Sequence, residues 1–234
     1  MGAHLILIEG MIGAGKSTMA GRLERRLTAR GEQARAYLEF AEDHPIRTKA
    51  VDLLRAAYPE PVWAPGDIGE DGLARDRSVY SVEQWGRLAE RCRNGGQTVI
   101  LESTFLQNSV LPAFLNGAPA GKCQEIFTRI EERLASARPL LVYLRPTDTA
   151  AAVERVHGAR SPVWTDWNMA SVAAFPWARS RDLHGREAII AMYRAWEVVV
   201  EELFAGYSFP KIILNDPQDD WDAALRHIDE KARP

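Results

Sequence analysis

An apolar run that passes directly into a glycine-rich turn constrains the fold of this chain more than any other feature. Residues 4–9 are typical of a short buried strand, and residues 17–30 carry apolar side chains at helical spacing. The turn consists of Gly10, Met11, Ile12, Gly13, Ala14, Gly15, Lys16 and Ser17, followed by Thr18. It fits the Walker A pattern GxxxxGK(S/T), in the strand–loop–helix context that this pattern requires.

Each part of this loop has a physical role in holding phosphate. Glycines let the backbone curl so that successive N–H groups face the phosphates, and the following helix adds its positive N-terminal end. Lys16 supplies a mobile positive charge, and the Ser17 hydroxyl is suited to ligate Mg²⁺. We therefore predict that residues 10–18 bind ATP with Mg²⁺ and that Lys16 is catalytic. A turn that only joined a strand to a helix would leave Lys16 and Ser17 without a purpose.

Short apolar runs alternate with helical patterns along the rest of the chain. Further strands are predicted at residues 34–40, 98–101, 140–144 and 211–214. Helices are predicted at residues 46–58, 81–93, 122–137, 147–157, 186–204 and 219–231. This alternation is typical of an α/β fold with a parallel sheet covered on both faces, and we expect residues 1–234 to form one domain.

Two stretches do not follow this alternation. Residues 58–80 are rich in Pro, Gly and Asp, and we interpret them as an acceptor-site insertion. Residues 161–181 show no clear period and hold several aromatic residues, so we interpret residues 155–183 as a lid and acceptor region.

Composition excludes several classes of protein. The net charge of −3 lacks the basic excess of a nucleic-acid binder. No segment approaches the ~20 apolar residues of a membrane span, and the first apolar run is too short for a signal peptide. Only two cysteines occur, Cys92 and Cys123, which favours a reducing cytoplasm. We expect a cytoplasmic protein with a small-molecule partner, and whether it forms a homodimer stays open.

The run from Leu7 to Thr18 resembles the opening of deoxyribonucleoside kinases and thymidylate kinases. The resemblance continues by position over most of the chain, with acidic residues after the second strand, Glu102 after the third and an Arg-bearing helix after the fourth. It implies a three-layer P-loop NTPase-type fold with five parallel strands in the order 2-3-1-4-5 and helices on both faces. It also implies an Arg-rich lid and the use of ATP with Mg²⁺.

Carboxylates after the second and third strands are candidates for the chemistry. A hydroxyl acceptor needs a base within hydrogen-bond reach, at the carboxyl ends of the strands where open α/β sheets bind ligands. Glu102 fits as the catalytic base, or as a Walker B-like ligand that holds Mg²⁺ through water. In the resembling kinases an Arg follows this carboxylate, whereas here Ser103 does. Glu39, Glu42 and Asp43 either bind acceptor hydroxyls or amines, or form a solvated loop.

Arginines in and beyond the helix after the fourth strand are candidates for the lid. Arg155 and Arg160 are predicted to be catalytic, because phosphoryl transfer needs positive charge on the transferring group. Arg179, further along the chain, is predicted to bind the acceptor. The alternative for these arginines is surface ion pairing.

Two further groups of residues complete the predicted site. Trp164 and Trp167 suggest an acceptor pocket that stacks on a flat or sugar ring, although core packing is the default for such side chains. The residues after the fifth strand are predicted to meet adenine, as in the resembling kinases; they are Asn215, Asp216 and Pro217.

These features favour an ATP-dependent phosphotransferase acting on a hydroxyl of a small molecule, with a nucleoside as the first candidate. An antibiotic or aminosugar kinase is an alternative, because acidic loops suit a cationic acceptor. A nucleoside monophosphate kinase requires a phosphate-binding Arg near these strands, for which Arg47 is the nearby candidate after the second strand. The acidic acceptor surface would repel such an anion. If the protein is not a kinase, the alternative function is that of an ATP-binding regulator or an ATPase.

Overall fold

A computed structural model describes residues 4–46 and 82–232 of the chain. Its centre is a parallel sheet in the order β2-β3-β1-β4-β5. The strands are β1 (Leu5–Gly10), β2 (Ala34–Tyr37), β3 (Thr98–Glu102), β4 (Leu140–Arg145) and β5 (Lys211–Asn215). The predicted five-stranded parallel sheet with order 2-3-1-4-5 is therefore confirmed, and the fold is of the P-loop NTPase type that the resemblance implies.

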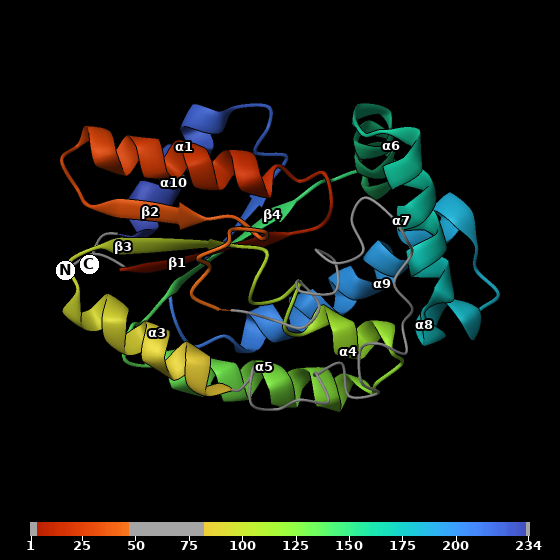
Figure 1. Cartoon of the computed structure of the whole chain (residues 1–234), viewed down its shortest axis with the longest axis horizontal. Helices are drawn as coiled ribbons and strands as arrows, with labels where there is room; N and C mark the ends of the chain where they lie inside the picture. Colours follow the sequence, from red (N-terminus) through yellow and green to blue (C-terminus); the bar gives the residue numbers. More distant parts are fainter. Residues whose placement is uncertain (1–3, 47–81, 233–234) are drawn as a thin grey trace.

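Helices cover both faces of this sheet. They are α1 (Lys16–Ala29), α3 (Val82–Asn94), α4 (Leu111–Leu115), α5 (Ala120–Leu134), α6 (Thr149–Ala159), α7 (Pro162–Ala174), α8 (Pro176–Arg179), α9 (Gly185–Gly206) and α10 (Trp221–Ala232). Figure 1 shows α1 and α10 on one face and α3, α5 and α9 on the other. The same view places α6, α7 and α8 beyond the carboxyl ends of the strands, where a site in such a sheet is expected.

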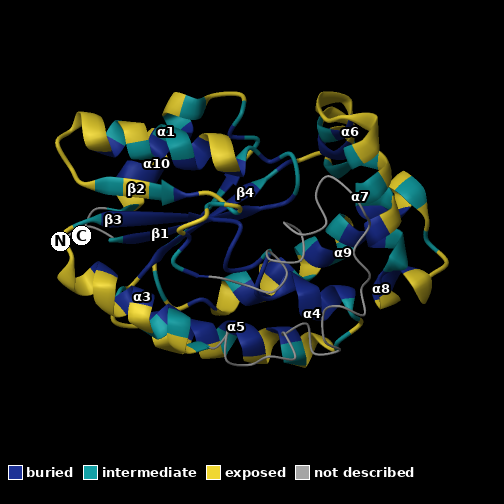
Figure 2. Cartoon of the chain, in the orientation of Figure 1, coloured by how far each residue is buried: buried dark blue, intermediate teal, exposed yellow. Residues whose placement is uncertain are grey.

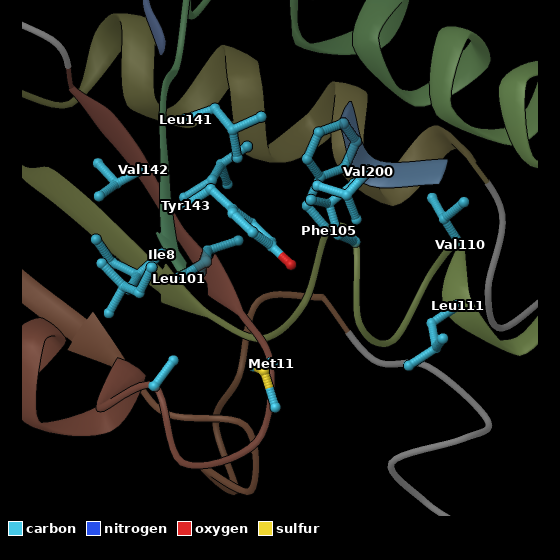
Figure 3. Packing of buried hydrophobic residues seen from close by; sticks show 14 of the residues in the cluster. Ile8, Met11, Leu101, Phe105, Val110, Leu111, Leu141, Val142, Tyr143 and Val200 are labelled. Carbon is cyan, nitrogen blue, oxygen red and sulfur yellow. The ribbon is translucent and has the colours of Figure 1, made fainter. Parts of the chain in front are cut away.

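The core lies in the middle strands and the faces of the helices against them. Strands β1 and β3 are buried along their whole length, because helices cover the sheet on both sides (Figure 2). Figure 3 shows Ile8, Leu101 and Tyr143, from three adjacent strands, together with Phe105 and Val200 of the same buried cluster. This packing fixes the strand ends, and with them the loops that follow.

Residues 161–181, which show no clear period in the sequence, are mostly helical, because they contain α7 and α8. The Ser161 hydroxyl caps α7 by accepting a hydrogen bond from Trp164 N, and Pro162 begins the helix. Helix α7 packs on α9 along one side and borders a cavity along another, so its apolar residues do not form a single stripe. A predicted helix at residues 46–58 and the insertion at residues 58–80 fall on residues 47–81, which lie outside the described part.

Within residues 4–46 and 82–232, none of the helices combines the length and the apolar character that crossing a bilayer demands.

Candidate active site

The Walker A loop is packed so tightly against two helices that its glycines cannot be replaced freely. Gly13 has φ 77°, and a Cβ added there would lie 2.6 Å from Val156 Cγ2 on α6. Gly15 has φ 87°, and its added Cβ would lie 2.5 Å from Trp221 Cη2 on α10. A positive φ and a close neighbour both require glycine at these positions. Within the loop, Gly10, Met11 and Ala14 are buried.

The functional groups of the loop lie where α1 begins. Lys16 is buried, and its ammonium donates a hydrogen bond to Met11 O at 2.9 Å across the loop. Ser17 and Thr18 are exposed at the first turn of α1. Backbone N–H groups at a helix N-terminus have no partner within the helix and attract anions. The loop therefore has the geometry of a phosphate site.

Glu102 ends β3 beside the loop, in register with Ile8 of β1. Its two carboxylate oxygens accept hydrogen bonds from Ser103 Oγ at 2.6 Å and from Glu39 N at 2.9 Å. Ser103, the residue that replaces the Arg of the resembling kinases, adopts a left-handed conformation with φ 62°. Such a conformation in a non-glycine residue is uncommon and is typical of functional sites. The turn fixes the Glu102 carboxylate at the strand end.

Glu39 follows β2, and its side chain enters the same region. Gln107 Nε2 donates a hydrogen bond to Glu39 Oε1 at 3.1 Å. Burial, followed by the negative charge of Glu102, raises the pKa of Glu39 from 4.5 to about 7, although Lys16 acts in the opposite direction. A carboxylate with a pKa near neutrality can exchange a proton at physiological pH.

A third carboxylate, Glu9, was not among the residues that we singled out from the sequence. It is completely buried and accepts hydrogen bonds from Phe105 N at 2.6 Å and Gln107 N at 3.1 Å. Burial raises its pKa to about 7 against the effect of these hydrogen bonds. Glu9 thereby holds the segment after β3 that carries Gln107. The available signal was an acidic residue inside an otherwise apolar strand.

One cavity of about 1200 Å³ joins the loop, the carboxylates and the region of α6 and α7. The predicted residues that line it are Ile12, Gly13, Gly15, Lys16, Ser17, Thr18, Glu39, Glu42, Glu102, Arg160, Trp164 and Trp167. Lining residues that the sequence analysis missed include Gln107, Asn108, Leu111, Asn168, Ser171 and Tyr193. These residues lie far apart in the sequence, in a turn and in several helices. Their polar side chains could not be told from ordinary surface residues by local sequence alone.

The predicted lid arginines lie in different environments. Arg160, just after α6, lines the cavity, and its guanidinium carbon lies 5.4 Å from the centre of the Trp164 ring. All three arginines are exposed, but neither Arg155 on α6 nor Arg179 at the end of α8 is among the described residues that line the cavity. Of these three arginines, Arg160 is therefore the one that the fold brings to the cavity.

The remaining predicted residues border the site without lining the cavity. Asp43 is exposed and forms an ion pair with Arg35. After β5, the Asp216 carboxylate accepts hydrogen bonds from the backbone and hydroxyl of Thr147. Its neighbours Asn215 and Pro217 are exposed and buried, respectively. The next residue, Gln218, donates through Nε2 to Gly13 O at 2.7 Å, so this segment contacts the Walker A loop.

The candidate ligands for Mg²⁺ are compatible with a shared protein–nucleotide site. In the part of the chain that the structure describes, no group of three or more His, Cys, Asp and Glu side chains is arranged to hold a metal. Mg²⁺ commonly uses one or two protein oxygen ligands, together with phosphate oxygens and water. The Ser17 hydroxyl and the Glu102 carboxylate line the same cavity and supply ligands of that type.

The chain is similar in fold to solved structures of nucleotide-binding proteins. Deoxyadenosine kinase from M. mycoides with bound dATP is 16% identical, with 97% of this chain and 98% of that chain covered and a TM-score of 0.49. The YorR protein from Bacillus subtilis, in complex with phosphorylated GDP, is 14% identical, with 97% and 94% covered and a TM-score of 0.47. No protein-family model matches the chain, and no curated protein matches it by sequence. The predicted resemblance to deoxyribonucleoside kinases is thus confirmed as a distant likeness of fold.

Proposed function

We propose that this protein is an ATP-dependent phosphotransferase that moves the γ-phosphoryl group to a hydroxyl of a small, nucleoside-like molecule. The observation that carries this proposal is a cavity that the Walker A loop, Glu39 and Glu102 line together. Residues 1–234 would act as one kinase domain. Both Cys92 and Cys123 are free thiols, which favours a reducing cytoplasm as its location.

The loop and the lid provide the positive charge that phosphoryl transfer needs. Backbone N–H groups at the start of α1 and the Lys16 ammonium bind the phosphates of ATP. When bound, Mg²⁺ would neutralise phosphate charge, with Ser17 and Glu102 as its protein ligands. Arg160, just after α6, lines the same cavity as the loop, and there it would stabilise charge that develops during transfer.

The environments of the two carboxylates favour different roles for them. Both oxygens of Glu102 accept hydrogen bonds from the protein, which hold the carboxylate in one orientation, as suits a metal ligand. Glu39 has a pKa of about 7, which suits a base that takes the proton of the acceptor hydroxyl. We therefore assign the proton transfer first to Glu39 and the metal to Glu102. A base role for Glu102 is the alternative that mutagenesis must test.

The acceptor side of the cavity favours a neutral or cationic molecule over an anion. Glu39, Glu42 and Glu102 contribute negative charge, while Arg160 is the only arginine among the described lining residues. This balance disfavours a nucleoside monophosphate, and Arg47 lies outside the described part of the chain. The same acidic residues keep an aminosugar or aminoglycoside antibiotic as the second candidate acceptor.

The test is ADP release by the purified protein with Mg²⁺-ATP, measured alone and with panels of nucleosides and aminosugars. A kinase releases ADP faster with its acceptor and produces a phosphorylated acceptor, which mass spectrometry detects. Lys16→Ala serves as the inactive control. Equal ADP release with and without every acceptor would refute the kinase and favour an ATPase.

A further inference from the structure

The Walker A loop is supported by a segment that lies 205 residues further along the chain. Gln218, in the turn between β5 and α10, donates a hydrogen bond through Nε2 to Gly13 O at 2.7 Å. A Cβ added at Gly15 would lie 2.5 Å from Trp221 Cη2 and 3.6 Å from Gln218 Cγ, so both side chains rest against the loop. Neither of them is among the described residues that line the cavity. The segment therefore contacts the loop outside the cavity.

The turn that carries Gln218 is fixed at both ends. At its start, Asp216 N donates a hydrogen bond to Arg145 O at 2.9 Å, which ties the turn to the end of β4. At its end, the Asp220 carboxylate accepts a hydrogen bond from Ala223 N at 2.9 Å, where α10 begins. A side chain on a fixed backbone loses little further freedom when it binds, so Gln218 can hold the loop in one orientation.

The hydrogen bond to Gly13 O sets the direction of the next N–H group. In a trans peptide unit, the C=O and the following N–H point in opposite directions. Because Gly13 O is directed at Gln218, the Ala14 N–H points to the other side of the loop. There it donates to Met11 O at 3.2 Å. The Lys16 ammonium donates to the same carbonyl oxygen at 2.9 Å, so the two donors converge on one point.

That convergence is what a phosphate oxygen requires. Two donors that meet on a carbonyl oxygen can also meet on a phosphate oxygen, which is an acceptor with greater negative charge. The opposite orientation of the peptide would turn Gly13 O toward the phosphate, and the two oxygens would repel each other. Glycine restricts the rotation of its peptide plane less than any other residue does. A partner outside the loop is therefore needed to select one orientation.

We propose that Gln218 is a positioning residue of the phosphate site, which acts through Gly13 and does not itself touch the ligand. This inference rests on the proposed binding of ATP at the Walker A loop. It deepens that proposal by adding a side chain from the opposite end of the sequence, whose effect is on the phosphates of the nucleotide.

The test measures the binding of inorganic tripolyphosphate and of a non-hydrolysable ATP analogue, each with Mg²⁺, by calorimetry. Gln218→Met removes the donor and keeps the length of the side chain and its contact with Gly15. Both dissociation constants should rise about 2- to 12-fold, the equivalent of one ordinary hydrogen bond. Gln124→Met is the matched control, because it removes the exposed hydrogen bond from Gln124 Nε2 to Thr128 Oγ1 on α5. It should bind both ligands as the wild type does.

Two further readouts separate positioning from a purely structural role. Hydrogen exchange followed by NMR should become faster at the Ala14 amide in Gln218→Met, while the amides of β3 exchange as in the wild type. In the transfer reaction, the KM for ATP should rise with little change in kcat, because the donor meets the phosphate both before and during transfer. Gln218→Asn, whose amide is one methylene shorter, is a second variant and should show the same changes. A lower melting temperature with unchanged dissociation constants would make Gln218 structural.

The outcomes distinguish this inference from the proposed function. Weaker binding of both ligands by Gln218→Met, in a protein that transfers no phosphoryl group to any acceptor, would support the positioning role and refute the kinase. Phosphoryl transfer with equal dissociation constants in the wild type and both variants would refute the positioning role alone. Weaker binding of the ATP analogue with unchanged binding of tripolyphosphate would assign Gln218 to the adenosine part of the nucleotide, and would also overturn the inference.

Discussion

Replacing Glu39 by Gln tests the assignment of the base, because this change keeps the size of the side chain and removes its charge. The variant should lose about 10²- to 10⁴-fold in phosphoryl transfer, the usual contribution of a positioned base. ATP binding should change little, because Lys16 and the backbone of the loop are untouched. Glu90→Gln, which alters an exposed carboxylate on α3, is the matched control.

The pH profile gives the same test a second readout. Because the pKa of Glu39 is raised to about 7, its carboxylate is protonated and inactive below that pH. The wild-type kcat/KM should therefore fall tenfold for each pH unit below about 7 and level off above it. In Glu39→Gln the residual rate should lose this inflection. An inflection that persists near pH 7 would assign the titration to another group, such as Glu9, and would refute the role of Glu39.

Stability should change in the opposite direction to activity. The folded-state pKa of Glu39 lies above its ordinary value, so folding disfavours the ionised form. This penalty is absent below about pH 4.5 and complete above about pH 7, where a rise of that size corresponds to about 3 kcal/mol at most. Glu39→Gln should therefore unfold at higher denaturant concentration than wild type at pH 8, and at a similar concentration at pH 4. A less stable variant at pH 8 would show that Glu39 is mainly a structural residue.

Three further substitutions test the rest of the site. Lys16→Ala should abolish transfer and keep the cooperative thermal transition, whereas loss of that transition would make Lys16 structural. Glu102→Gln should weaken Mg²⁺-dependent ATP binding in a titration with and without the metal, whereas a loss confined to the transfer step would make Glu102 the base. Arg160→Ala should lower kcat by more than Arg155→Ala does, because only Arg160 lines the cavity. Equal kcat values for the two variants would remove that distinction.

Much of the scaffold follows from local sequence. Residues 10–18 predict the Walker A loop because glycine, lysine and serine at fixed spacing have a direct physical purpose. Buried parallel strands are continuous apolar runs, so β1, β3 and β4 are visible in the sequence to within about one residue at either end. The strand order came from the resemblance to known kinases, since apolar runs alone do not state which strands are neighbours.

Tertiary structure decided the composition of the site. Glu9, Glu39 and Glu102 are far apart in sequence and meet because β1 and β3 are neighbours and β2 lies beside β3. Burial, with the nearby negative charge of Glu102, raises the pKa of Glu9 and of Glu39, and no local pattern encodes that effect.

Helix α7 shows the same limit for secondary structure. Its apolar residues face both α9 and the cavity, so the sequence lacks the single apolar stripe by which a helix is recognised. Local sequence thus determined the strands, most of the helices and the phosphate loop. The packing of distant elements decided which of Arg155 and Arg160 lines the cavity, because that outcome depends on contacts between residues that no short segment contains.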